Sequence, residues 1–321
     1  MLRLVLIDGH AILYRAYHAL PPLTTSKGVP SGAVYGFISI LLKTINDLKP
    51  TNLAVAFDRR EPTFRKKLFA DYQVQRPKME ENLVSQVDLM HSLIKTMGIA
   101  VYELAGFEAD DVIGTLAEQV VKGEKSEVIV VTGDRDLLQL VTERIRIYMP
   151  VKGISEAKLF GKNEVVEKYG VLPSQVVDYK ALIGDQSDNY PGVAGIGPKT
   201  AENLIKKYGS LEGIYKNIDF IEPKLKEKLT RDKEKAYLSY KLAEIVKNAP
   251  VNLDLASTKL ISLDRPDVRA VFEELGFRSL ITRLSGKSNK PASVQNKSGL
   301  RRGEEKKAAE KQKKAEQTSL F

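Results

Sequence analysis

Acidic residues stand at the ends of three short apolar runs in this sequence. Asp8 and Asp58 each follow a run of apolar and β-branched residues, and Asp134 and Asp136 follow the run VIVVT. If these runs are parallel strands, their carboxyl ends meet at the edge where open α/β sheets bind ligands. Each aspartate taken alone also fits a helix N-cap or a turn. The same residue type at three strand ends indicates a shared site.

Two further segments supply acidic candidates. FEADDVIGTLAEQV, residues 107–120, has the pattern of a helix that begins with acidic residues, and IGDQSDNYPGV, residues 183–193, holds two aspartates three residues apart. Helix capping accounts for one or two of the acids in the first segment, and a turn accounts for either aspartate in the second. The candidate metal ligands are then Asp8, Asp58, Glu108, Asp110, Asp111, Asp134, Asp136, Asp185 and Asp188.

Carboxylates in this number indicate a hard divalent cation. The chain holds 3 His and 0 Cys, so the usual ligands of a zinc site are scarce. Mg²⁺ and Mn²⁺ prefer oxygen ligands. Two such ions a few Å apart stabilise the attacking and leaving oxygens of an in-line phosphoryl displacement. We therefore expect a phosphodiester-cleaving centre with two or three Mg²⁺ or Mn²⁺ ions.

Strand and helix patterns alternate through the first half of the chain. Further strand-like runs occupy residues 99–104 and 144–149, and apolar residues recur with a 3.6-residue period over 79–97. This alternation predicts an α/β fold with a mostly parallel central sheet flanked by helices. The carboxylates would then lie at one edge of that sheet.

The composition changes twice along the chain. Strand patterns stop near residue 165, and residues 285–321 hold almost no apolar side chains. We therefore expect an α/β catalytic domain over 1–165, an all-α subdomain over 166–284 and a disordered basic tail over 285–321. Ten Lys and Arg against four Asp and Glu give this tail +6 of the formal charge of +9, so any polyanion site elsewhere must be a local patch.

The lack of cysteine and of a membrane-spanning apolar run suits the cytoplasm, where we expect a nucleoid-associated protein. We expect a monomer without membrane contact.

Two segments have residue types that bind nucleic-acid backbones. PGVAGIGPKTA, residues 191–201, joins a Gly-Ile-Gly turn to a helix start, whose free N–H groups suit a phosphate. Residues 59–78 interleave cations with aromatic side chains, which is typical of a single-strand clamp and also of a solvated helix face. The expected DNA contacts are Arg65, Lys66, Lys78, Gly195, Gly197, Lys199 and Thr200.

Five motifs, in order, resemble the 5′ nuclease domain of bacterial DNA polymerase I, within the flap endonuclease family. They are LIDGHAILYRAYHAL, AFDRREPTFR, FEADDVIGTLA, VTGDRDLLQL and IGDQSDNYPGVAGIGPKTA. The resemblance covers about residues 1–284 and implies the PIN-like 5′ nuclease fold with a helix-hairpin-helix motif at 191–200. It implies a structure-specific 5′→3′ exonuclease and flap endonuclease that leaves a 5′-phosphate.

The resemblance also assigns roles to particular residues. It implies that the nine carboxylates surround the metal ions and that Arg15, Tyr72 and Arg76 face the scissile phosphate. For Arg15, a helix residue extending toward solvent is the alternative. The expected substrate is branched or nicked double-stranded DNA with a 5′ flap or an RNA primer, bound with a K⁺ ion on the hairpin carbonyls. The expected roles are primer removal and DNA repair.

The chain departs from the family pattern at Gln73. The family has lysine there, followed by arginine three residues later, and this chain keeps only Tyr72 and Arg76 of that motif. Losing one preorganised donor costs about 10²–10³ in kcat. Either Lys66 or Lys78 substitutes for the lysine, or the enzyme is slow, and we expect reduced but real activity. A catalytically weak flap-binding adaptor is the alternative, and an RNA-specific nuclease is disfavoured by the duplex-binding hairpin.

The last five residues, QTSLF, resemble the Gln-x-x-Leu-Phe peptide by which bacterial replication proteins bind the sliding clamp. Gln317, Leu320 and Phe321 would make the contacts, the last two as apolar anchors. A disordered leash of roughly 32 residues reaches about 30 Å. Unrelated tail residues are the alternative. Since no polymerase segment follows, we expect a stand-alone nuclease.

Overall fold

The computed structural model describes residues 1–123, 125–153 and 156–284. Its centre is one six-stranded sheet with the order β3-β2-β1-β4-β5-β6. The first five strands in the chain run parallel and the last is antiparallel to its neighbour. The strands are β1 (Leu2–Asp8), β2 (Asn52–Ala56), β3 (Ala100–Tyr102), β4 (Ser126–Val131), β5 (Ile145–Lys152) and β6 (Glu156–Phe160). The mostly parallel sheet predicted from the sequence is confirmed, and β6 is an additional strand.

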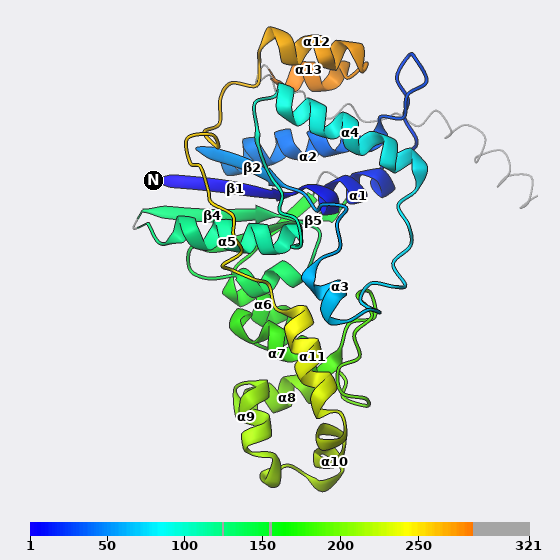
Figure 1. Cartoon of the computed structure of the whole chain (residues 1–321). Coiled ribbons are helices and arrows are strands. Elements are labelled where there is room, and N and C mark those ends of the chain that lie inside the picture. The colour runs from blue at the N-terminus through cyan, green and yellow to red at the C-terminus, as the bar shows by residue number, and fades with distance from the viewer. Residues whose placement is uncertain (124, 154–155, 285–321) are drawn as a thin grey trace, which may run out of the picture.

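Helices cover both faces of this sheet (Figure 1). Alternate residues of β1 point to opposite faces, so Leu4 and Leu6 pack with one hydrophobic cluster and Val5 and Ile7 with the other. The first cluster includes α5 (Ala109–Val121), and the second includes α1 (Gly9–Ala19), α2 (Gly32–Leu48) and α4 (Glu81–Thr96). Burial on both faces explains why β2 and β4 are continuous apolar runs.

Another group of helices extends from the sheet as a second, all-α part, seen at the lower end of Figure 1. They are α6 (Lys162–Tyr169), α7 (Val176–Ile183), α8 (Pro198–Tyr208), α9 (Leu211–Lys216), α10 (Pro223–Arg231) and α11 (Lys233–Ala243). Short 3-10 helices are η1 (Asp136–Leu140), η2 (Pro173–Gln175) and η3 (Ile218–Phe220), and α3 (Phe64–Leu68) precedes α4.

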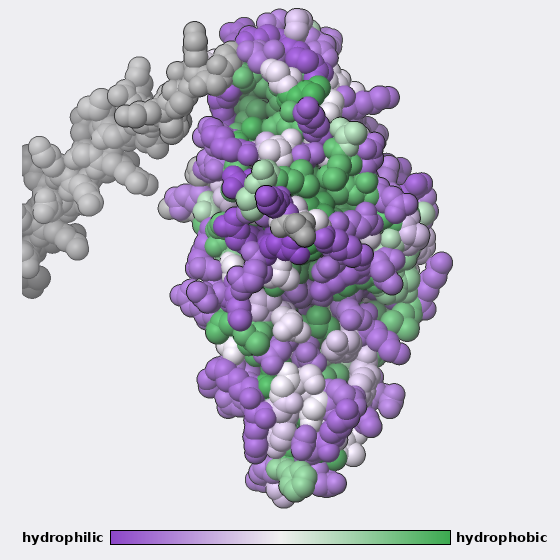
Figure 2. All heavy atoms as spheres, turned by 90° about the vertical axis from the view of Figure 1, so that its left-hand side faces the viewer, coloured by the Kyte–Doolittle hydropathy of each residue, from purple (hydrophilic) through white to green (hydrophobic). Residues whose placement is uncertain are grey.

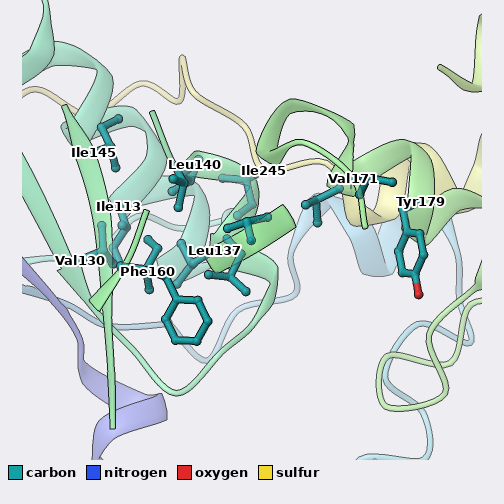
Figure 3. Close-up of a cluster of buried hydrophobic side chains, with 14 of the residues drawn as sticks. Ile113, Val130, Leu137, Leu140, Ile145, Phe160, Val171, Tyr179 and Ile245 are labelled. Atoms are coloured by element: carbon teal, nitrogen blue, oxygen red, sulfur yellow. The ribbon is translucent and has the colours of Figure 1, made fainter. Parts of the chain in front are cut away.

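One hydrophobic cluster runs from the sheet into the helical part (Figure 3). Val130 and Ile145 contribute from the sheet, Leu137 and Leu140 from η1, and Tyr179 from α7. The turn after β4 is therefore fixed between the two parts, and it carries Asp134 and Asp136. The core thus holds these carboxylates in place.

The last two helices correct the expected subdomain boundary. We assigned residues 166–284 to one helical subdomain, but α12 (Pro266–Glu274) and α13 (Arg278–Leu284) pack beside α4 and α2 in the α/β part (Figure 1). Their buried side chains Val268, Phe272 and Leu280 belong to the same cluster as the β1 core. An amphipathic pattern predicts a helix but does not say which neighbour its apolar face covers.

One face of the molecule differs in hydropathy between its two ends (Figure 2). On the face turned to the viewer in Figure 2, hydrophobic residues gather in the upper half, and the lower end is mostly hydrophilic.

Among the residues with a described structure, no helix is long and apolar enough to cross a membrane. The expected tail, 285–321, lies outside the described residues.

Candidate active site

A cavity of about 1010 Å³ opens at the carboxyl ends of β1, β2 and β4. Seven of the nine candidate carboxylates line it, from three strand ends, the start of α5 and the loop after α7. They are Asp8, Asp58, Glu108, Asp110, Asp134, Asp136 and Asp188. The parallel topology therefore brings together residues that are up to 180 positions apart in the sequence.

Asp8 lies at the back of this cavity and also begins a helix. Its side chain accepts a hydrogen bond from the Ala11 backbone N–H at 3.1 Å, which caps α1, and another from the Thr132 hydroxyl at 2.7 Å. Burial raises the pKa of Asp8 to about 7, with a further contribution from the charge of Asp58. Asp8 therefore caps α1, as the N-cap alternative predicts, and also lines the cavity.

Asp58 is the more accessible neighbour, with 42% of its side chain exposed. Its Oδ1 accepts a hydrogen bond from the Ala109 N–H at the start of α5, at 2.8 Å, and its Oδ2 lies 3.3 Å from the His10 Nδ1. Burial opposes ionisation, but the His10 interactions and the Ala109 N–H hold the pKa of Asp58 below its usual value. His10 is a residue that the sequence analysis missed.

Asp110 carries the least compensated charge of the group. Within the described part of the chain, neither a hydrogen bond nor an ion pair reaches its carboxylate. Burial raises the pKa of Asp110 well above its usual value, and the charges of Asp134, Asp8 and Asp58 add to the shift. A carboxylate in this position is costly unless a cation offsets it.

These residues fit a divalent cation by their chemistry. The cavity gathers oxygen donors whose negative charges repel one another, and two or more positive charges would relieve that repulsion. In the described residues, no three histidine, aspartate or glutamate side chains are gathered tightly enough to hold an ion as they lie. Mg²⁺ usually keeps several waters and takes one or two carboxylates directly, so this spacing suits ions bound partly through water.

A lysine that the sequence analysis missed lies beside this group. Lys180 of α7 donates a hydrogen bond to Asp136 and another to Asp185 at 2.8 Å, and only 9% of its side chain is exposed. Burial raises the pKa of Asp136 to about 7, although the charge of Lys180 acts in the opposite direction. Asp185 also accepts from the Ser187 N–H at 2.8 Å and does not line the cavity. The only sequence signal was a lysine inside the otherwise apolar helix VVDYKALI.

Arg65 and Asp111 correct two expectations. We expected Arg65 to bind DNA and Asp111 to bind metal, but they form a buried bidentate ion pair at 2.7 and 2.8 Å, with 3% and 0% of their side chains exposed. Arg65 also donates to the carbonyl oxygens of Leu242 and Glu244. Asp111 accepts from the backbone N–H groups of Glu108 and Val246. This ion pair and these hydrogen bonds hold α3, α5 and the end of α11 together.

Glu108 lies between this ion pair and the cavity. Its side chain accepts hydrogen bonds from Arg65 at 3.2 Å, Thr63 at 3.2 Å and the Tyr72 hydroxyl at 3.3 Å. Burial raises the pKa of Glu108 to about 7, and the charge of Arg65 opposes that shift. Arg65 therefore supports the site from behind instead of contacting DNA.

The segment at 71–76 is joined to the loop that holds Asp188. The Gln73 side chain donates to Asp188 Oδ1 at 2.9 Å, and its backbone N–H donates to the Asp188 carbonyl at 2.9 Å. The Tyr72 hydroxyl lies 3.3 Å from Asp188 Oδ2 and shares its single proton between Asp188 and Glu108. Gln73 adopts a left-handed conformation with φ of 54°, which is uncommon for a residue other than glycine. Gln73, which stands where the family has lysine, thus contacts the candidate metal ligand Asp188 through an uncharged amide.

The expected cations are distributed around the cavity mouth. Arg15, Arg76 and Lys66 line the cavity, whereas Lys78 is exposed outside the lining. Arg15 donates to the Gly153 carbonyl at 3.2 Å, and Lys66 donates to the Tyr72 carbonyl at 2.9 Å. Positive side chains therefore surround the carboxylate group, as a phosphate between them would require.

The expected hairpin leads into α8 with Gly197 at the N-cap and Pro198 at the first position. Gly195 has φ of 79° and is exposed, Lys199 pairs with Glu202 at 3.1 Å, and Thr200 lies in the first turn. Lys228 and Arg231 of α10 donate to the carbonyl oxygens of Gly195 and Ala194 at 3.0 and 3.4 Å. The proposed K⁺ site on hairpin carbonyls stays a prediction.

Two family models match consecutive parts of the chain, which together span residues 3–266. The 5′-3′ exonuclease N-terminal resolvase-like domain matches residues 3–170, and the 5′-3′ exonuclease C-terminal SAM fold matches residues 171–266. A 5′-3′ exonuclease of Aquifex aeolicus is 41% identical over 282 residues, which are 88% of this chain and 94% of that protein. The chain therefore belongs to the 5′-3′ exonuclease family.

Other relatives are longer proteins or share the fold alone. DNA polymerase I of Bacillus subtilis is 43% identical over 88% of this chain, and the chain spans about a third of the length of such polymerases, 32% in that case. Among solved structures, T5 5′-exonuclease with zinc has a TM-score of 0.63 at 20% identity, covering 85% of this chain and 98% of that one. Flap endonuclease-1 from Methanococcus jannaschii has a TM-score of 0.54 at 20% identity, covering 88% and 90%.

Proposed function

We propose that this protein is a divalent-metal-dependent 5′→3′ exonuclease and flap endonuclease that leaves a 5′-phosphate. The observation that carries the proposal is the group of uncompensated carboxylates, with Asp110 at its centre, in a cavity whose other lining includes Arg15 and Arg76. Structures of the same fold support it, since T5 5′-exonuclease is described with zinc ions and the T5 D15 flap endonuclease with DNA and metal ions.

The residues divide into three tasks. Asp8, Asp58, Asp110 and Asp134 would hold the ions, with Asp136, Asp185 and Asp188 as further ligands. When bound, two Mg²⁺ or Mn²⁺ ions supply an activated water and stabilise the leaving oxygen. Arg15 and Arg76 would orient the scissile phosphate from the cavity mouth, and Tyr72 holds Glu108 and Asp188 in place. The hairpin would bind the duplex backbone through its N–H groups, near Lys199 and Thr200.

The proposal is tested with a 5′-labelled flap duplex in Mg²⁺, in Mn²⁺ and in EDTA. We expect cutting near the flap junction with either ion and none in EDTA, and the Asp134→Ala/Asp136→Ala variant should bind the flap but not cut it. Binding without cutting by the unaltered chain would favour the adaptor alternative, in which the fold serves to hold flap DNA. Equal cutting of a flap-free RNA strand would favour the RNA-specific alternative.

The neutral residue Gln73, at the position where the family has lysine, is the observation that favours the adaptor alternative. We expect Gln73→Lys to raise the single-turnover cleavage rate, by up to about 10²–10³, because a cation returns to the cavity mouth. Gln75→Lys adds the same charge at an exposed position outside the cavity lining and serves as the matched control. An unchanged rate in Gln73→Lys would show that Lys66 or another cation already supplies this charge.

We also propose that the tail binds the bacterial sliding clamp through Gln317, Leu320 and Phe321, which lie outside the described residues. Deleting 317–321 should lower clamp affinity at least tenfold and leave flap cleavage in the absence of clamp unchanged. The measurement is clamp binding by calorimetry alongside the flap assay. Clamp binding that persists after the deletion would refute the peptide assignment. Such tethering would suit primer removal and repair at nicks.

A further inference from the structure

The carboxylates around the cavity fall into two groups that differ in how their charge is compensated. Asp8, Asp110 and Asp134 have no lysine or arginine partner in the described structure, and their hydrogen bonds come from neutral groups such as Thr132. Asp136 is different, because it makes an ion pair with Lys180, which also binds Asp185. Among the aspartates that line the cavity in the described structure, Asp136 is therefore the one already paired with a lysine or arginine, while the lining glutamate, Glu108, is paired with Arg65.

Lys180 is held firmly where it lies. It projects from the middle of α7, a helix whose other members are mostly buried, and 9% of its side chain is exposed. Its ammonium joins η1, which carries Asp136, to the loop after α7, which carries Asp185. The ammonium thus occupies oxygen atoms that the proposed function would assign to a divalent ion, in surroundings from which water is largely excluded.

A divalent ion on this side has to compete with that ammonium. Two cations close together repel each other strongly in a poorly solvated site, and Asp136 would have to give up its hydrogen bond from Lys180 to ligate an ion fully. On the other side, around Asp110, an arriving ion only relieves repulsion among carboxylates. The two sides should therefore differ in affinity for the same ion.

We propose that Lys180 is a positioning residue that acts as a resident cation, so that divalent ions bind the two sides of the cavity with unequal affinity. It keeps Asp136 and Asp185 in place before the second ion arrives and sets the concentration at which that ion binds. This inference rests on the proposed function, since it takes the cavity to be a divalent-metal site.

The test is Mn²⁺ binding to the full chain without DNA, followed by the electron paramagnetic resonance of free Mn²⁺. For the unaltered protein we expect one tight and one weak site. Lys180→Met removes the charge at similar length, and the weak site should tighten at least tenfold while the tight site stays unchanged. Lys180→Arg keeps the charge and should keep the weak site.

Lys180→Met leaves two carboxylates without their partner and could misfold for that reason. A second variant therefore separates a change in metal affinity from a loss of the fold. Lys180→Met/Asp185→Asn removes one of those charges and should also show a tightened second site, with circular dichroism confirming the fold. A weak site of unchanged affinity in both folded variants would overturn the role of Lys180 and leave the nuclease proposal standing. Failure of every variant, and of the unaltered chain, to bind Mn²⁺ would overturn both.

Discussion

Replacing Asp110 with asparagine is expected to abolish flap cleavage and to stabilise the metal-free protein. The carboxylate lies among Asp134, Asp8 and Asp58 without a hydrogen-bond or ion-pair partner in the described chain. The neutral amide has nearly the same shape and removes the repulsion with these three aspartates and with Glu108. Active sites that hold uncompensated charge commonly trade stability for function, and we expect a gain of about 1 kcal/mol in the free energy of unfolding.

The loss of activity should be large because Asp110 would ligate the ions directly. We expect single-turnover cleavage to fall by about 10³-fold, the scale on which a preorganised electrostatic group acts. Urea unfolding in EDTA and flap cleavage in Mg²⁺ measure the two effects. Glu118→Gln, on the same helix and outside the cavity lining, is the control and should change neither. Retained cleavage, or a destabilised Asp110→Asn protein, would contradict the assignment.

The second large effect is expected at Arg65, on stability. Arg65→Met leaves Asp111 buried without its partner, and the carbonyl oxygens of Leu242 and Glu244 lose their donors. Breaking a buried ion pair by removing one member costs about 3–5 kcal/mol. Urea unfolding should show this loss. The double variant Arg65→Met/Asp111→Leu should recover only part of it, because the unpaired charge of Asp111 is gone but the backbone N–H groups of Glu108 and Val246 lose their acceptor.

Lys67→Met is the matched control for Arg65→Met. Lys67 lies in the same short helix but is exposed, and its replacement should change stability by less than about 0.5 kcal/mol. If Arg65→Met were as stable as this control but bound DNA more weakly, the original expectation of a DNA contact at Arg65 would be restored.

The strand-end rule explains why much of the site could be predicted from the sequence. Asp8, Asp58 and Asp134 follow strands that are buried on both faces, and parallel strands present their carboxyl ends along one edge. No local detail was needed to bring these residues together, since the topology does so. The helix start at Glu108 and Asp110 could likewise be read from its acidic residues and apolar period.

Buried charge pairs were the part that the sequence could not show. Arg65 lies in a stretch of cations and aromatic residues that suits either solvent or nucleic acid, and only the position of Asp111 beneath α3 turns it inward. Lys180 is one cation in an apolar helix, and its role depends on Asp136, 44 residues away. The packing of α12 on α4 was not predicted for a similar reason, because which helix an apolar face contacts is decided by the tertiary structure.

If the carboxylate cavity hydrolyses a phosphodiester of flap DNA, the oxygen that enters the product comes from water. The most direct measurement is one turnover of a flap duplex with excess enzyme and Mg²⁺ in H₂¹⁸O, with mass spectrometry of both products and an EDTA control. We expect one ¹⁸O atom in the 5′-phosphate of the product beyond the flap junction and no reaction in EDTA. Label on a 3′-phosphate, or no cleavage with Mg²⁺, would contradict it.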